Sequence, residues 1–196
     1  MPANLWLAST SVYRKALLEK LTPNFEMAKP QVDETALPGE TAMQLVERLA
    51  IAKAQAVAAN LDDGLVIGSD QVALFDNDIL GKPHTAENAF AQLKRFSGHK
   101  VTFLTGLAVV NARTGAVVHC VDTFYVHFRQ LTDQDIHTYI SREQPLNCAG
   151  SFKSEGLGIT LFEKLEGDDP NSLIGLPLIK LHQLLKQQGR DVLLQP

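Results

Sequence analysis

GLVIGSDQV at residues 64–72, running on to LGKP at residues 80–83, is the stretch on which the fold prediction rests. Leu65, Val66 and Ile67 form a continuous apolar run bounded by glycines, which predicts a short strand buried on both faces. Asp70 follows directly, and a carboxylate that leaves a buried strand is costly unless a cation, a metal or several donors meet it. Lys82 can supply that cation. The alternative at this point is that Asp70 caps a turn and Lys82 lies in solvent, since turns favour aspartate.

The length and composition of the chain limit the class of protein. A chain of 196 residues that is 45% hydrophobic can bury one sizeable core, either as one domain over residues 1–196 or as two tightly joined lobes. The net charge of −4 argues against a nucleic-acid-binding protein, which normally carries a basic excess. A small anionic ligand remains possible, because a few lysines and arginines can focus a positive field locally.

The two cysteines and the N-terminal residues bear on the compartment. Cys120 and Cys148 have neither CxxC nor metal-type spacing, so both are expected to stay reduced in a reducing cytoplasm. The chain starts without a basic segment, and the apolar patch at residues 5–8 is too short for a signal or a membrane span. We therefore expect a soluble cytoplasmic protein without a membrane partner.

Hydrophobic periodicity and capping residues predict alternating strands and helices. Strands are expected at residues 5–9, 25–28, 65–67, 73–75, 79–80, 101–110 and 116–128. A hairpin turn at residues 76–78 is expected to join 73–75 to 79–80, and the last two strands are expected to form a long hairpin. Helices are expected at residues 13–21, from Thr41 onward, at 85–96 and 132–140, and from about residue 175. Residues 141–158 are expected to be irregular. This alternation indicates an α/β fold with a mixed sheet.

Two basic residues lie on the apolar sides of predicted helices. Arg14 shares the side of Leu17, Leu18 and Leu21 and follows hydroxyl residues at the helix start, a position that suits an anion. Lys53 falls four residues after Leu49, so it must either snorkel or point into a cleft. The alternative for Arg14 is a side chain whose stem covers the core while its head reaches water.

Several common sites are absent from the sequence. The glycine-punctuated loop at residues 150–158 lacks the P-loop spacing, no Gly-x-Ser-x-Gly elbow occurs, and the six histidines show no metal-type pairing. What remains is a scattered set of charges: Arg14, Glu34, Lys53, Asp70 and Lys82. Polyphosphate chemistry needs such a set, because cations hold phosphate oxygens, carboxylates carry a divalent metal, and one carboxylate can activate water.

The chain resembles the Maf family over essentially its whole length. The matching motifs, in order, are LASTSxxRKxLL at residues 7–18, VDET at 32–35, RLAxxKA at 48–54, GSDQV at 68–72, GKP at 81–83, FRxL at 128–131, AGSF at 149–152 and IGLP at 174–177. The family implies an elongated mixed α/β sheet of the ITPase-like type with two lobes around a cleft. It also implies metal-dependent hydrolysis of nucleoside triphosphates to monophosphate and pyrophosphate. By this resemblance Asp70 is the proton acceptor, Asp70 and Glu34 hold the metal, and Arg14, Lys53 and Lys82 bind phosphate.

The chain looks more specifically like the YceF branch of this family, whose substrate is 7-methyl-GTP. That branch carries Asp-Gln, as at Asp70 and Gln71 here, whereas the branch that hydrolyses dTTP and UTP typically has Asp-Thr. It also carries a glutamate at the position of Glu155, where the other branch has glutamine. N7-methylation gives guanine a delocalised positive charge, which favours an aromatic face and a carboxylate. Glu155 can accept from the N1–H and N2–H edge and Tyr13 can stack on the ring, although the YceF pattern usually has tryptophan there.

Three hypotheses stay open from the sequence. The first is a 7-methyl-GTP pyrophosphatase that uses Mg²⁺, Mn²⁺ or a similar cation. The second is a pyrophosphatase for dTTP, UTP or other modified nucleotides. The third is a nucleotide-binding regulator of cell division with little turnover, because the family name is tied to septum inhibition. Whether the chain forms a homodimer is also open.

Overall fold

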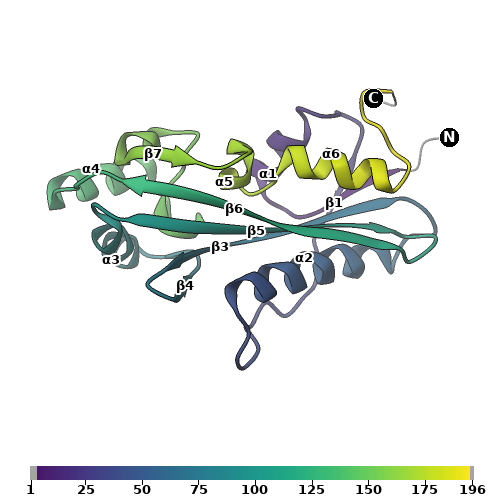
Figure 1. Cartoon of the computed structure of the whole chain (residues 1–196), viewed down its shortest axis with the longest axis horizontal. Coiled ribbons are helices and arrows are strands. Elements are labelled where there is room, and N and C mark those ends of the chain that lie inside the picture. The colour runs from purple at the N-terminus through teal and green to yellow at the C-terminus, as the bar shows by residue number, and fades with distance from the viewer. Residues whose placement is uncertain (1–3, 195–196) are drawn as a thin grey trace. The chain divides into compact units, whose positions relative to one another are not determined.

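The computed structural model describes residues 4–194 and shows a mixed α/β fold (Figure 1). The strands are β1 (Leu5–Ala8), β2 (Glu26–Ala28), β3 (Leu65–Phe75), β4 (Asp78–Leu80), β5 (Lys100–Asn111), β6 (Val117–Phe128) and β7 (Phe162–Glu166). The helices are α1 (Val12–Leu18), α2 (Ala42–Ala58), α3 (Ala86–Phe96), α4 (Asp133–Glu143), α5 (Pro170–Ile174) and α6 (Leu178–Gln187), with short 3-10 turns η1 (Ala149–Ser151) and η2 (Leu157–Leu161). The strands form one sheet in the order β2-β1-β3-β5-β6-β7, and β4 pairs with β3. β1 runs parallel to β2 and β3, whereas β4 and β7 pair in antiparallel fashion, so the predicted mixed sheet is confirmed.

The described chain divides into two compact units. The first contains the residues up to Asp70, Thr105–Asp122 and those from Asn171 onward. The second contains Gln71–Leu104 and Thr123–Pro170. The long strands β3, β5 and β6 contribute residues to both units.

Both faces of the sheet are buried in the first unit. Side chains alternate between the two faces of a strand, so Leu65 and Ile67 lie on one face and Val66 on the other. The first face packs against leucines of α1 and α6, and the second packs against the alanines and Val57 of α2 (Figure 1). This two-sided burial explains the continuous apolar runs in β1, β3 and β5.

Two glycines allow α2 to approach the sheet closely. A Cβ atom added to Gly68 would lie 2.1 Å from the carbonyl oxygen of Ala50, and one added to Gly106 would lie 2.0 Å from that of Val46. Both obstructing atoms belong to the helix backbone, so no side-chain rotation can relieve the overlap. The missing side chains on β3 and β5 therefore set the distance between α2 and the strands.

The predicted helix starts agree with the structure. Hydroxyl side chains of Ser11, Thr41, Thr85 and Thr132 accept the backbone N–H groups that begin α1, α2, α3 and α4. α3 has nearly the expected extent, whereas α1 ends at Leu18, short of the predicted end at residue 21. The hairpin between β3 and β4 is also confirmed, with Asp76 and Asn77 at positive φ as a tight two-residue turn requires.

Several further expectations about the elements were wrong. β3 does not stop before Asp70 but continues to Phe75, because its later residues pair with β4. α4 continues past Ile140 to Glu143, into the segment expected to be irregular. β7, which pairs with the end of β6, was not predicted, because FEKLE lacks the apolar alternation of a buried strand.

The second unit has its own core of aromatic rings. Phe128 contacts Phe96, Phe152 and Phe162 at centroid distances of 5.3 to 5.7 Å. Most of these contacts have edge-to-face geometry, which aromatic pairs prefer.

Among residues 4–194, none of the helices has the length and apolar character needed to cross a bilayer.

Candidate active site

A buried lysine joins two carboxylates in the first unit. Lys53 Nζ lies 2.7 Å from Asp70 Oδ1 and 3.0 Å from Glu34 Oε1. Lys53 and Asp70 are 6% and 7% exposed, whereas the Glu34 side chain is 60% exposed. The three residues come from α2, β3 and the loop between β2 and α2, so the fold brings together charges that are far apart in the sequence.

The position of Asp70 follows from the alternation along β3. Asp70 shares the parity of Val66 and Gly68, which face α2, and Lys53 extends from the buried side of that helix. Of the two alternatives left open for Lys53, the structure shows the inward one, because its side chain is 7% exposed and its Nζ meets Asp70. A buried carboxylate is tolerated here because a cation meets it directly. The alternative of a turn-capping Asp70 is excluded, since the residue lies inside a strand.

Arg48 and Glu40 hold the loop that carries Glu34. Arg48 donates from Nε to Glu40 Oε1 at 2.6 Å and from Nη2 to Glu40 Oε2 at 2.8 Å, a two-bond pairing. The same Nη2 also donates to the carbonyl oxygen of Thr35 at 3.1 Å. The bonds from Arg48 lower the pKa of Glu40 to about 2. This connection fixes the residue next to Glu34 against α2.

Arg14 is held through its side chain by the turn before α6. Its Nε donates to the carbonyl oxygen of Gly175 at 2.9 Å, and Ser69 Oγ donates to the same oxygen at 2.9 Å. Burial lowers the pKa of Arg14, while the negative charges of Asp70 and Glu34 act in the opposite direction. An arginine keeps its charge in proteins, so this guanidinium adds a cation near the two carboxylates.

The other four predicted site residues are divided between the two units. Tyr13 is partly buried on α1 of the first unit. Gln71, Lys82 and Glu155 belong to the second unit, and Lys82 and Glu155 are exposed. The residue after Lys82 is anchored, because Asn88 Nδ2 of α3 donates to the Pro83 carbonyl oxygen at 3.0 Å. The structure thus brings together Arg14, Glu34, Lys53 and Asp70, and the roles of all eight residues remain predictions.

The donor set suits a hard divalent cation. Within residues 4–194, no group of three or more His, Cys, Asp and Glu side chains comes together to hold a metal. Glu34 and Asp70 supply two carboxylates, and Mg²⁺ is commonly held by one or two carboxylates completed by water and substrate phosphates. The residues therefore fit the predicted metal.

A groove beside α2 is lined by none of the predicted site residues. A hollow of ≈ 630 Å³ is lined by the loop tip at Leu37 and by side chains such as Gln44, Ile51 and His119. Lys53, Asp70 and the other predicted site residues do not line it. Its volume therefore does not identify the candidate site, which is identified instead by the charged contacts of Lys53.

Comparison with known proteins identifies the family. The family model described as Maf-like protein matches residues 4–188. The chain belongs to the Maf family. A protein of Colwellia psychrerythraea (strain 34H / ATCC BAA-681) named "7-methyl-GTP pyrophosphatase" is 59% identical over 189 residues, covering 96% of this chain and 94% of the relative. A protein of the same name from Pseudoalteromonas translucida (strain TAC 125) gives the same identity and coverage. The resemblance inferred from the motifs is thus confirmed at the level of the Maf family.

Two supporting interactions were missed at the sequence level. The Arg48–Glu40 pair holds the loop that carries Glu34, and the Gly175 carbonyl oxygen holds Arg14. The sequence alone assigned a role to neither. The sequence did mark both residues, because Arg48 and Gly175 lie in Maf motifs. Spacing alone does not show which residue an arginine contacts, so their functions became visible only in the fold.

Proposed function

We propose that this Maf protein hydrolyses 7-methyl-GTP to 7-methyl-GMP and pyrophosphate with the help of a divalent metal. The observation that carries the proposal is the buried Lys53–Asp70 pair with Glu34 at 3.0 Å from the same ammonium. Membership of the Maf family and the names of two relatives at 59% identity supply the reaction class and the substrate.

Asp70 is proposed as the base that activates the attacking water. An ionised carboxylate has about four lone-pair sites, so the bond from Lys53 leaves acceptor capacity for a water molecule. Lys53 also orients the carboxylate, which favours general-base catalysis because the base must lie within hydrogen-bond reach of its proton. The water oxygen bonds to the α-phosphorus, its proton passes to Asp70, and the bond to pyrophosphate breaks.

Cations are proposed to hold the triphosphate. Arg14 contributes a guanidinium whose Nε is fixed by Gly175, so its remaining N–H groups can pair with phosphate oxygens. Lys53 and Lys82 are the further cations proposed for this task. A divalent cation held by Glu34 and Asp70 would supply charge neutralisation at the phosphate oxygens.

Base selection is assigned to residues outside the charge cluster. Glu155 is proposed to accept hydrogen bonds from the N1–H and N2–H groups of the methylated guanine, and Tyr13 is proposed to stack on its ring. Gln71 completes the proposed substrate contacts. A carboxylate and an aromatic face both favour the positive charge that N7-methylation introduces.

Replacement of Asp70 by asparagine tests the catalytic assignment. Asp70→Asn keeps the shape of the side chain but removes the base, so turnover should fall by about 100-fold or more while the protein remains folded. Asp76→Asn is the matched control, because Asp76 lies in an exposed turn at positive φ that asparagine also adopts. Normal pyrophosphate release by the Asp70→Asn protein would refute the role of Asp70.

A substrate panel separates the open alternatives. Pyrophosphate release should be fastest with 7-methyl-GTP, should need an added divalent metal, and should stop with a chelator. A preference for UTP or dTTP would favour the second hypothesis. Binding without pyrophosphate release would favour the regulator. Turnover that survives exhaustive chelation would contradict the metal requirement.

A further inference from the structure

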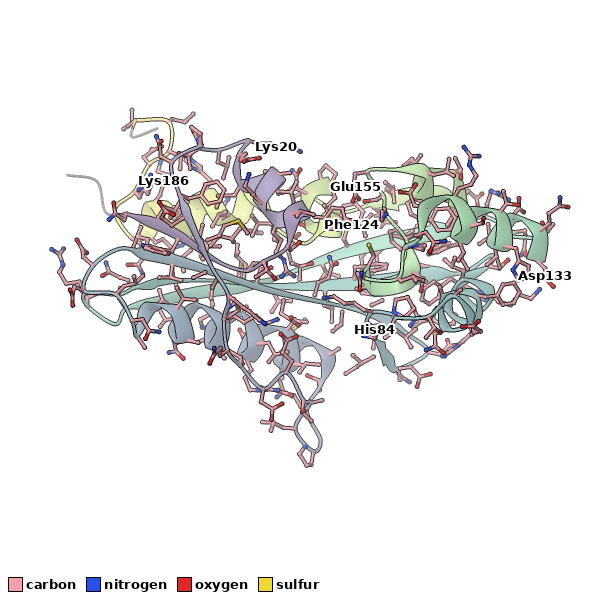
Figure 2. All side chains as sticks on the ribbon, turned by 180° about the vertical axis from the view of Figure 1, so that it is seen from behind. Lys20, His84, Phe124, Asp133, Glu155 and Lys186 are labelled. Carbon is pink, nitrogen blue, oxygen red and sulfur yellow. The ribbon has the colours of Figure 1, made fainter. Side chains whose placement is uncertain are left out.

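The loop that carries Glu155 is closed around one carbonyl group. The backbone N–H groups of Gly156 and Gly158 both donate to the carbonyl oxygen of Lys153, at 3.2 and 3.1 Å. A Cβ atom added to Gly158 would lie 2.3 Å from that oxygen, so the turn is too tight for a side chain there. Glu155 occupies the middle of this turn and is exposed (Figure 2).

Two side chains of α4 anchor the loop on both sides of Glu155. Before it, the Lys153 backbone N–H donates to Tyr139 Oη at 3.0 Å. After it, the Leu157 backbone N–H donates to Glu143 Oε2 at 2.9 Å. Tyr139 and Glu143 are four residues apart, so they lie on the same side of the helix.

Lys153 and Glu143 form a second connection. Lys153 Nζ lies 3.3 Å from Glu143 Oε1 and donates to the Glu143 carbonyl oxygen at 2.7 Å. The two side chains are only 20% and 21% exposed, so water screens this pair less than a surface salt bridge. The bond from the Leu157 N–H lowers the pKa of Glu143, which keeps its carboxylate ionised at neutral pH.

We infer that Glu143 is a positioning residue that sets base specificity by holding the loop on which Glu155 lies. The inference rests on the proposed function, in which Glu155 reads the guanine edge. Two parallel hydrogen bonds to a base require both carboxylate oxygens in a defined direction, and such a pair discriminates by about 10- to 100-fold between bases. Glu143 does not itself touch the base in this scheme. It limits the directions that Glu155 can adopt.

Glu143→Ala in the full-length protein tests the inference. The ratio of kcat/KM for 7-methyl-GTP to that for UTP should fall by about 10-fold, while kcat/KM for UTP stays within about 2-fold of wild type. Glu143→Gln keeps an acceptor for the Leu157 N–H but loses the charge, so its ratio should lie between those of the wild type and Glu143→Ala. Glu163→Ala is the matched control, since it removes an exposed carboxylate of β7 from the same unit and should leave the ratio unchanged.

A structural measurement accompanies the kinetics. Hydrogen exchange at the Leu157 amide should accelerate in Glu143→Ala, because this variant removes the acceptor of that N–H. It should accelerate less in Glu143→Gln, which retains an acceptor. If Glu143→Ala does not fold, Tyr139→Phe removes the acceptor of the Lys153 N–H and should lower the same ratio. A uniform loss of kcat/KM for all substrates would mean a purely structural role and would overturn the inference.

Glu155→Ala distinguishes this inference from the proposed function. If Glu155→Ala lowers the ratio and Glu143→Ala does not, positioning by Glu143 is refuted and base reading by Glu155 stands. If Glu155→Ala leaves the ratio unchanged, base reading itself is refuted. In the double variant, loss of Glu143 should cause no further fall in the ratio, and independent losses would overturn the inference.

Discussion

Gly68→Ala tests whether the close packing of α2 on β3 positions Lys53 next to Asp70. The added Cβ would lie 2.1 Å from the Ala50 carbonyl oxygen and 2.9 Å from the Ala54 Cβ. The first contact is about 1 Å shorter than ordinary van der Waals separation, and it involves helix backbone. The helix must therefore move away from the strand.

The size of the effect follows from this displacement. Overpacking of a core costs about 1–3 kcal/mol, and a clash with backbone belongs in the upper part of that range. For a chain of this size we expect the melting temperature to fall by about 4–12 °C. Since α2 carries Lys53, a shift of about 1 Å would misalign Asp70 and reduce kcat by about 100-fold.

Thermal unfolding and pyrophosphate release measure the two consequences separately. Gly81→Ala is the control for stability, because a Cβ there meets nothing within 4 Å, and it should change the free energy of unfolding by less than about 0.5 kcal/mol. Wild-type stability of Gly68→Ala would refute the close contact between α2 and β3. A lowered melting temperature with normal kcat would refute the placement of Lys53 by α2.

Three further predictions concern the site and its supports. Lys53→Met should destabilise the protein by about 3 kcal/mol in urea unfolding and abolish turnover, because it leaves the buried Asp70 carboxylate without its cation; unchanged stability would contradict this. The Glu40–Arg48 connection should be complete above the ordinary glutamate pKa of 4.5 and be lost as the pH falls towards the folded-state pKa of about 2. An NMR titration of the Glu40 carboxyl with a midpoint near 4.5 in the unaltered protein would refute this connection, and Arg48→Ala should raise the midpoint towards 4.5. Thr41→Ala should cost about 1 kcal/mol by thermal unfolding through loss of the α2 capping box, whereas Thr41→Ser should retain most of it.

Local chemistry in the sequence determined where most elements begin. Hydroxyl caps at Thr41, Thr85 and Thr132 marked three helix starts, because an N-cap depends on residues within one turn. The turn at Asp76 and Asn77 was predictable for the same reason. The Maf motifs also named Asp70 and its charged companions before any contact between them was known.

The tertiary structure alone decided where elements end and which charges meet. β3 runs through Asp70 because neighbouring strands supply partners, and strand length depends on pairing rather than on local composition. Lys53, Asp70 and Glu34 converge because Gly68 admits a helix backbone to the sheet, a fact that no spacing in the sequence expresses. The role inferred for Glu143 depends on the last turn of α4, which the sequence did not predict. Contacts between distant residues are set by packing, so the sequence named the candidate site residues and the fold decided their geometry.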